Sequence, residues 1–308
     1  MRRLARRLLD LARGDIDRKT DEIRLAIGRM ESRHARSTAC SGLRDAEFRV
    51  FSQWGDDGII QYLLGRVPVA NTEFVEFGVE DYSEANTRFL LCNDNWRGLI
   101  IDAGLAHQRF VAERGLEWRH DLTAISSFIT RDNIDGLIRG AGFGGDIGLL
   151  SVDIDGNDYW VLDAIASVSP RIVIVEYNAM FGADLAVTVP YRPDFHRSRA
   201  HYSGVYYGAS LAALARLADR KGFAFVGCNS AGNNAYFVRR DVLGDLREIG
   251  VQDGFVMNRF RESRDPAGGL TFVADPRERL RLIADLEVIE TTSGRAFTIA
   301  DLYRTGHA

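Results

Sequence analysis

Two strand patterns joined by a glycine turn constrain the fold of this chain more than any other feature. Between Phe74 and Ala103 an apolar segment is followed by a glycine turn, a helical pattern and a second apolar segment. Glu76 and Gly78 close the first segment, and Asp102 closes the second, 24 residues after the glycine. A βαβ unit of this type places an adenosine-like ligand across its strand tips, where the second acid accepts hydrogen bonds from ribose hydroxyls. The pattern therefore predicts a pocket for a nucleoside cofactor.

Further strand and helix patterns alternate along the chain. Strand-like runs span 148–154, 171–177, 223–228 and 235–239, and helical patterns span 53–64, 126–138, 157–166 and 210–221. Alternation of this kind is typical of a mainly parallel sheet with helices on both faces. The turn NSAGNN at 229–234 favours an antiparallel hairpin at one edge of that sheet. We therefore predict a Rossmann-like α/β fold.

The first 38 residues differ in charge from the rest of the chain. They hold eleven Arg and Lys residues and six acids, a net charge of +5 that leaves −9 for the remainder. Leucines at 4, 8 and 11, and then Ile23, Ile27 and Met30, recur at the spacing of an amphipathic helix. The helix could pack on the body or pair with a second copy, forming a homo-oligomer. Alternatively, it could rest on anionic lipid as a peripheral membrane contact.

The predicted organisation has three parts. Residues 1–44 form the basic helical extension, 45–243 the α/β domain, and 244–308 a C-terminal extension with a helix near 276–286 and a short strand near 270–273. The net charge of −4 gives no reason to expect a nucleic-acid partner. Three cysteines without metal-binding spacing fit a reducing cytosol, and no run approaches the ~20 apolar residues of a membrane span. We expect a cytoplasmic protein, at the inner face of the membrane if the basic helix binds lipid.

A second group of acids follows two more predicted strands. Asp153 and Asp155 end one strand, and their i, i+2 spacing directs both carboxylates to one side. Asp158 follows in the turn, and Glu176 and Asn178 end the next strand. Such oxygen ligands can hold Mg²⁺ or Mn²⁺. Alternatively, one acid deprotonates a substrate hydroxyl, or the sequence DGND only forms a turn and caps a helix.

The loop at 191–210 is rich in polar groups that suit a sugar-like substrate. The substrate-binding candidates are Tyr191, Arg199, Tyr202, Tyr206 and Tyr207. His201 is the candidate base because an imidazole titrates near neutral pH. A packed loop with surface arginines would have a similar composition. His120 and Asp121 lie near the expected end of the third strand, where we expect Asp121 to border the cofactor.

With both acidic groups placed, the chain resembles class I S-adenosylmethionine-dependent methyltransferases, and within them the FkbM-like group, over about residues 50–240. VEFGVEDYSEANT corresponds to the first motif of the class, through Glu76 and Gly78. Asp102 corresponds to the ribose-binding acid. VDIDGNDYWVLDAI corresponds to the acid-x-acid-Gly signature at the fourth strand, and PRIVIVEYN to the fifth strand with its acidic tip.

The resemblance implies methyl transfer from S-adenosyl-L-methionine to an oxygen of a small-molecule or glycan acceptor, such as a sugar, a polysaccharide or a secondary metabolite. It implies that Gln53, Glu76 and Asn86 lie near the methionine end of the cofactor, and that Asp153 lies near its reactive end. Catalysis would then depend on Asp153, Asp155 or His201, with or without a metal ion. One departure is that Glu80, Asp81 and Tyr82 occupy places where typical members have further glycines.

Two other interpretations remain open. Asp153 and Asp155 after an apolar strand are also the Asp-x-Asp pattern with which a nucleotide-sugar glycosyltransferase holds Mn²⁺ and a diphosphate. Such an enzyme has no need of the set Glu76, Gly78 and Asp102 in this form. The missing motif glycines would also be compatible with a non-catalytic member of the fold.

Overall fold

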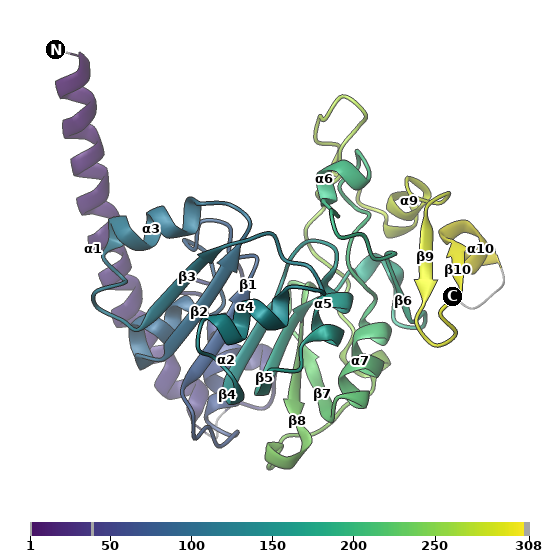
Figure 1. Cartoon of the computed structure of the whole chain (residues 1–308), viewed down its shortest axis with the longest axis horizontal. Coiled ribbons are helices and arrows are strands. Elements are labelled where there is room, and N and C mark those ends of the chain that lie inside the picture. Colours follow the sequence, from purple (N-terminus) through teal and green to yellow (C-terminus); the bar gives the residue numbers. More distant parts are fainter. Residues whose placement is uncertain (1, 38–39, 305–308) are drawn as a thin grey trace.

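A seven-stranded sheet in the order β3-β2-β1-β4-β5-β8-β7 forms the centre of the molecule (Figure 1). The computed structural model describes the backbone of residues 2–37 and 40–304 and the side chains of 16–37 and 40–302. The strands are β1 (Glu73–Phe77), β2 (Arg97–Asp102), β3 (Leu122–Ser126), β4 (Gly145–Val152), β5 (Val168–Glu176), β7 (Phe223–Cys228) and β8 (Asn234–Arg239). β1 to β5 are parallel, and β8 is antiparallel to both β5 and β7. The predicted mainly parallel sheet with an antiparallel edge hairpin is confirmed.

Helices cover both faces of this sheet because its strands are apolar on both sides. The helices are α1 (Arg2–Arg36), α2 (Asp56–Leu64), α3 (Ala106–Arg114), α4 (Ile134–Gly140), α5 (Asp158–Ala164) and α7 (Leu211–Arg220). Val75 of β1 packs in a core with α4, α5 and α7, whereas Phe74 points to the other face, in a core with α2 and α3. Between β1 and β2 the predicted helix is one short π-helical segment, η2 (Leu90–Asp94).

A smaller lobe stands beside the carboxyl ends of β4 and β5 (Figure 1). Its antiparallel sheet has the order β10-β9-β6. The lobe contains β6 (Val187–Thr188), β9 (Glu287–Glu290), β10 (Ala296–Thr298), α6 (Arg197–Ala200), α9 (Pro276–Arg281) and α10 (Ile299–Arg304), while α8 (Val251–Gly254) packs near β7. Short 3-10 turns are η1 (Leu43–Ala46), η3 (Ala179–Phe181) and η4 (Arg240–Val242). β6 and β9 pair with each other although they lie on opposite sides of residue 243, the predicted domain boundary. The division of the chain into three parts stays a prediction. The strand expected at 270–273 is wrong, since only an isolated bridge joins Arg264 to Leu270 there.

The N-terminal helix α1 is 35 residues long and extends past the sheet at one end (Figure 1). Its C-terminal half is fixed to the body by ion pairs of Asp21 with Arg88 and of Arg36 with Asp94. Four apolar side chains on α1 are 54–68% exposed: Ile16, Ile23, Ile27 and Met30. A second copy or a lipid surface as their partner stays a prediction. No described helix combines the length and apolar character needed to cross a membrane.

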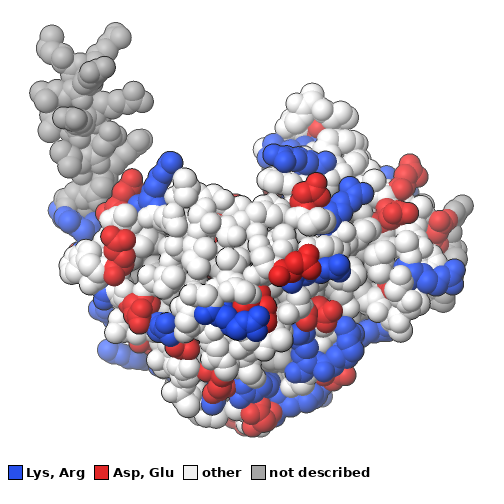
Figure 2. Space-filling view, in the orientation of Figure 1, with Lys and Arg blue, Asp and Glu red and all other residues white. Residues whose placement is uncertain are grey.

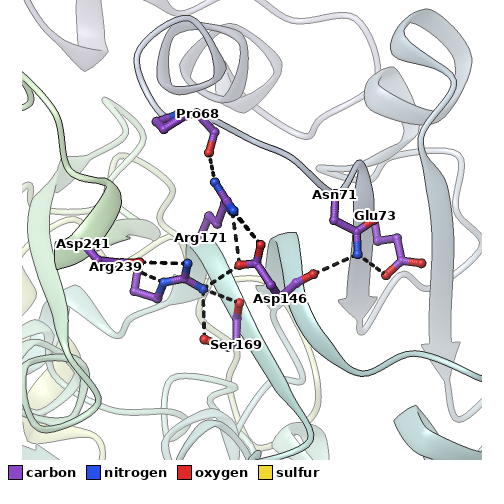
Figure 3. Close-up of polar contacts among 8 residues, drawn as sticks. All are labelled: Pro68, Asn71, Glu73, Asp146, Ser169, Arg171, Arg239 and Asp241. Carbon is purple, nitrogen blue, oxygen red and sulfur yellow. Dashed lines mark hydrogen bonds and ion pairs between the residues drawn. The ribbon is translucent and has the colours of Figure 1, made fainter.

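An ion-pair network joins the amino ends of β4 and β5 to the carboxyl end of the antiparallel β8 (Figure 3). Asp146 at the start of β4 accepts hydrogen bonds from Arg171 at 2.6 Å and from Arg239 at 2.8 Å. Arg239 also pairs with Asp241 and donates to the carbonyl of Ser169. Asp146 thus separates two arginines, and the two guanidinium groups lower the pKa of its carboxyl.

Replacing Asp146 by Ala is expected to lower the free energy of unfolding by about 1–2 kcal/mol, because two arginines lose their shared acceptor. The loss is modest because the Asp146 side chain is 39% exposed and water screens the pairs. Urea denaturation of the variant measures the loss, with Asp285→Ala at an exposed position as the control. An unchanged midpoint would contradict a stabilising role for the network.

Candidate functional site

The carboxyl ends of the parallel strands open into one cavity of about 1080 Å³. Figure 2 shows the surface hollowed between the sheet body and the smaller lobe. Its lining includes residues 84–86, 128–129 and 195–198, together with Phe260, Glu262 and residues 264–268. The predicted site residues that line it are Gln53, Glu76, Gly78, Asn86, Asp102, Asp153, Asp155, Glu176 and Tyr202. The two acidic groups noted in the sequence therefore meet in one place, as expected for tips of parallel strands.

The turn after β1 requires glycine at residue 78. Gly78 has φ +72°, and a Cβ atom at this position would lie 1.5 Å from the carbonyl oxygen of Asp153. The tips of β1 and β4 therefore touch through their backbones. This contact sets the distance between the Gly78 turn and the Asp153 group.

The same turn is left-handed at two further residues that are not glycine. Glu80 has φ +47° and Tyr82 has φ +64°, conformations that ordinary side chains rarely adopt. These are places where the resemblance leads us to expect glycines. The Tyr82 side chain is fully buried in the core, whereas Glu80 lines the cavity. The departure from the motif therefore adds the Glu80 carboxylate to the cavity lining, whereas the Tyr82 ring packs in the core.

Glu76 fixes the loop that follows this turn. Its carboxylate accepts hydrogen bonds from the backbone N–H of Asn86 at 2.8 Å and of Thr87 at 3.1 Å, and from the Thr87 hydroxyl. Burial raises the pKa of Glu76 to about 7. Asn86 in turn donates to the Ser151 hydroxyl of β4 at 3.1 Å. Glu76 and Asn86 border the cavity, and Glu76 also holds its wall in place.

Asp102 lies at the tip of β2, where the sequence predicts the ribose-binding acid. One carboxylate oxygen accepts from the backbone N–H of Gly104 at 2.8 Å and the other from that of Glu80 at 3.0 Å. Each oxygen keeps a second lone pair for a ligand hydroxyl. Ribose binding at Asp102 is compatible with this geometry and stays a prediction.

Asp121 and His120 are not at the cavity. They precede β3, so they lie at its amino end, on the sheet edge away from the strand tips. Asp121 is 3.5 Å from the Arg97 guanidinium, and His120 hydrogen-bonds Asn95 at 3.0 Å. The prediction that Asp121 borders the cofactor is wrong, because these residues precede the strand that they were expected to end. The tip of β3 instead leads to Phe128 and Ile129, which line the cavity and were missed.

Asp153, Asp155 and Glu176 form a compact acidic cluster. One carboxylate oxygen from each lies within 4.8 Å of the others. Burial and the neighbouring carboxylates raise the pKa of both Asp153 and Glu176 well above the usual range. Glu176 is 7% exposed, and among the described residues its Oε2 has no hydrogen-bond partner. The cluster can therefore take up a cation or a hydrogen-bond donor from a ligand.

Asp158 and Asn178 do not belong to this cluster. Asp158 accepts from the backbone N–H of Ile154 at 2.7 Å and of Gly156 at 2.9 Å, which is the turn chemistry of DGND. The Asn178 amide donates to the carbonyls of Val205 and Tyr207, and its oxygen accepts from Met180. The metal-ligand prediction for both is corrected, because both side chains are fully buried against backbone groups and neither lines the described cavity.

The loop at 191–210 contributes fewer site residues than predicted. Tyr206 is buried with its hydroxyl on the Glu287 carbonyl, and Tyr207 is buried beneath a guanidinium. Tyr191 packs on Trp160, Arg199 is exposed, and His201 hydrogen-bonds Ser203 at 2.7 Å. Of these five and Tyr202, only Tyr202 lines the cavity in the described chain. The predicted roles of the five are corrected, since none of them lines the described cavity.

Arg197 was missed and is central to this wall. Its guanidinium lies 2.7 Å from an oxygen of Asp155, donates to the Gly204 carbonyl at 2.6 Å and covers the Tyr207 ring at 4.1 Å. It thereby ties α6 to the tip of β4. Trp54 and Phe260 were also missed, and they form a stacked pair in the cavity wall with centroids 6.4 Å apart. Neither pairing follows a local sequence pattern.

Asp57 supports the backbone just before Gln53. Its Oδ2 accepts four hydrogen bonds of 2.7–2.8 Å from Val50, Phe51 and Ser52, while Oδ1 is buried without a partner among the described residues. Burial raises the pKa of Asp57 to about 6. A proton on Oδ1 would leave all four bonds intact, so the folded state favours the protonated acid.

Asp57→Asn is expected to stabilise the protein by about 1–3 kcal/mol at pH 8, because the amide imitates the protonated acid. The folded-state pKa is raised, so the contribution of Asp57 to stability is complete below about pH 4 and is lost as the pH rises through about 6. Urea denaturation at pH 5 and pH 8 measures both effects. A variant less stable than the wild type at pH 8 would contradict the assignment.

Comparison with known proteins gives limited information. No family model matches the chain, and no curated protein matches it. Among solved structures, an O-methyltransferase from neocarzinostatin biosynthesis, solved with S-adenosylmethionine and a hydroxynaphthoic acid, is 20% identical over 55% of this chain and 49% of its own, with a TM-score of 0.34. A putative O-methyltransferase from Nostoc punctiforme is 14% identical over 58% of this chain and 54% of its own, with a TM-score of 0.37.

The N-terminal domain of EvdMO1, solved with S-adenosylhomocysteine and D-fucose, is 12% identical over 71% of this chain and 97% of its own, with a TM-score of 0.37. This chain spans about half the length of the first two structures. None of the three TM-scores reaches 0.5, so the fold assignment depends on the sheet order described above. The comparisons do not confirm membership of the FkbM-like group.

Proposed function

We propose that this chain is an S-adenosyl-L-methionine-dependent methyltransferase that methylates a hydroxyl group of a small polar acceptor. The observation that carries the proposal is that one cavity contains both the Gly78 and Asp102 strand tips and the cluster Asp153, Asp155 and Glu176. The first pair suits the ribose and backbone approach of a nucleoside cofactor. The cluster suits removal of a proton from an acceptor.

The charge of the cavity favours a cationic cofactor over a nucleotide sugar. Besides Glu84, whose charge is paired with Arg49, its lining includes eight acidic residues: Glu76, Glu80, Asp102, Asp153, Asp155, Glu176, Glu262 and Asp265. The two lining arginines, Arg197 and Arg264, already pair with Asp155 and Glu262. A diphosphate would meet net negative charge here, whereas a sulfonium cation would be stabilised. This argues against the glycosyltransferase alternative.

Buried acceptor atoms favour a hydroxylated methyl acceptor. Glu176 Oε2, Asn157 Oδ1 and Asn234 Oδ1 belong to residues that are 3–7% exposed and line the cavity, and the described structure gives these atoms no partner. Leaving such atoms unpaired costs ~1–3 kcal/mol each. A sugar-like ligand supplies several O–H donors, and the Trp54–Phe260 pair supplies an apolar surface for its ring.

Methyl transfer in this cavity would be an in-line displacement. When bound, S-adenosyl-L-methionine supplies an electrophilic methyl group. Asp102 and the Gly78 turn hold the nucleoside, and the wall of Tyr202 and Asn157 orients the acceptor; orientation of this kind can lower the barrier by ~7–11 kcal/mol. As the acceptor oxygen bonds to the methyl carbon and the carbon–sulfur bond breaks, whichever of Asp153 and Glu176 is ionised would take the hydroxyl proton.

Metal assistance is part of the proposal. Asp153, Asp155 and Glu176 each offer one oxygen for Mg²⁺ or Mn²⁺, and the unpartnered Oε2 of Glu176 fits this use. A bound cation would lower the pKa of an acceptor hydroxyl. We also propose that the protein is cytoplasmic and has no nucleic-acid partner. A second copy or a lipid surface against α1 likewise remains a proposal.

Isothermal titration with S-adenosylhomocysteine, first with EDTA and then with excess Mg²⁺ or Mn²⁺, tests the function. We expect micromolar binding that is lost in Asp102→Ala, and metal-dependent heat that is lost in Asp153→Ala. Binding of S-adenosylhomocysteine without metal-dependent heat would remove the metal from the proposal. If neither condition gave binding, and UDP or GDP with Mn²⁺ did, the glycosyltransferase interpretation would replace it.

A further inference from the structure

The backbone of Glu80 is strained, and the residue lies at the cavity. It is left-handed, with φ +47°, and its backbone N–H donates to Asp102 at 3.0 Å. A glycine would adopt this conformation without strain. Non-glycine residues held in this conformation cluster at ligand sites in proteins. Glu80 lines the cavity, and a glycine at this position would have no side chain to offer there.

The surroundings of Glu80 are acidic. Burial, and then the charges of Asp155, Asp81, Asp102 and Glu84, raise the pKa of its carboxyl. Within the part of the chain that the structure describes, no Lys or Arg forms an ion pair with it. Glu84, by contrast, lines the same cavity and is paired with Arg49. When ionised, Glu80 therefore has no Lys or Arg partner among the described residues, and a cationic ligand would supply one.

Glu80 also lies between the two ends of the proposed site. It bonds through its backbone to Asp102, the acid for the ribose, and its side chain is close enough to Asp155 of the acidic cluster for their charges to interact. In S-adenosyl-L-methionine the sulfonium joins the ribose to the methyl group that is transferred. A cofactor that places its ribose at Asp102 and its methyl group toward Asp155 brings the sulfonium past Glu80.

We propose that Glu80 is a specificity-determining residue that supplies the counter-charge for the sulfonium and so selects the charged cofactor over the neutral product. The inference rests on the proposed function. In the reaction the carbon–sulfur bond breaks and its electron pair stays on sulfur, which becomes a neutral thioether. The attraction to Glu80 then ends, and S-adenosylhomocysteine leaves more readily than S-adenosyl-L-methionine.

The test compares the Kd of S-adenosyl-L-methionine with that of S-adenosylhomocysteine in the wild type, Glu80→Gln and Glu84→Gln. Glu80→Gln keeps the size of the side chain and the demand on the backbone, so it removes mainly the charge. We expect its Kd for S-adenosyl-L-methionine to rise about tenfold while the Kd for S-adenosylhomocysteine stays within about twofold. Glu84→Gln should leave both values within about twofold, since its charge is already paired.

Two outcomes would overturn the inference in different ways. An unchanged ratio of the two Kd values in Glu80→Gln, with both ligands bound by the wild type, would overturn the role of Glu80 and leave the proposed function standing. Failure of the wild type to bind either ligand would overturn both. Unfolding midpoints of the two variants show whether an equal loss of affinity for both ligands is caused by a damaged fold. An equal loss of affinity in a folded Glu80→Gln variant would also overturn the inference.

Discussion

Gly78→Ala is expected to abolish binding of S-adenosylhomocysteine and to lower the free energy of unfolding by about 3 kcal/mol or more. The added Cβ would lie 1.5 Å from the carbonyl oxygen of Asp153, and that oxygen belongs to backbone that cannot rotate away. The φ of +72° adds strain of ~1–2 kcal/mol for an alanine. The turn after β1 and the tip of β4 must separate to relieve the clash. Separation would displace both the Gly78 turn and Asp153, which are neighbouring parts of the proposed cofactor site.

Gly136→Ala is the matched control for this substitution. Gly136 lies in α4, and a Cβ there would meet nothing within 4 Å. Alanine is the better helix former by about 1 kcal/mol, so this variant should be as stable as the wild type or more stable. Calorimetric unfolding and titration with S-adenosylhomocysteine measure both variants. Wild-type binding by Gly78→Ala would show that the contact between β1 and β4 does not shape the site.

Asn178→Asp is expected to lower the free energy of unfolding by about 3–5 kcal/mol. The Asn178 side chain is fully buried, and its amide nitrogen donates to the carbonyls of Val205 and Tyr207 at 3.1 and 3.0 Å. A carboxylate would place a negative oxygen against two carbonyl oxygens in a buried position. Either the charge is buried without a partner or the acid takes up a proton, and both lower stability.

The same variant separates a structural role of Asn178 from metal binding. Aspartate is a better ligand for Mg²⁺ or Mn²⁺ than asparagine, so a metal ligand would tolerate this change or bind more tightly. Asp153→Asn is the complementary variant, since it should lose Mn²⁺ heat while retaining most of the stability. Titration with Mn²⁺ and urea denaturation of both variants provide the comparison. A stable Asn178→Asp protein with tighter metal binding would return Asn178 to the ligand set.

The positions of the acidic groups follow from sequence because a parallel sheet has one functional edge. Apolar runs locate β1, β2, β4 and β5, and residues that end such strands must meet at their carboxyl ends. That rule brings Gly78, Asp102, Asp153 and Glu176 to the cavity without any knowledge of packing. The hairpin of β7 and β8 is also local, since its turn and both strands are adjacent in the chain.

Prediction fails where a strand is weakly marked. β3 is short and only partly buried throughout, so its apolar pattern does not indicate where it begins. If a short parallel strand is placed a few residues too early, a residue that precedes the strand is predicted to lie at its carboxyl end. Asp121 therefore changes from a candidate cofactor neighbour to a partner of Arg97, far from the strand tips.

By itself the sequence determined the α/β architecture and the acidic character of the site, because strand periodicity and strand-end composition are local properties. Only the tertiary structure decided which polar side chains are free to meet a ligand. Asn178 and Asp158 are buried and form hydrogen bonds with backbone groups. Tyr206 and Tyr207 are buried in the smaller lobe, where β6 pairs with β9 from about a hundred residues later in the chain. Arg197 reaches Asp155 only through that lobe. Hydrogen-bond competition and burial depend on segments distant in sequence, and residue type alone does not encode their outcome.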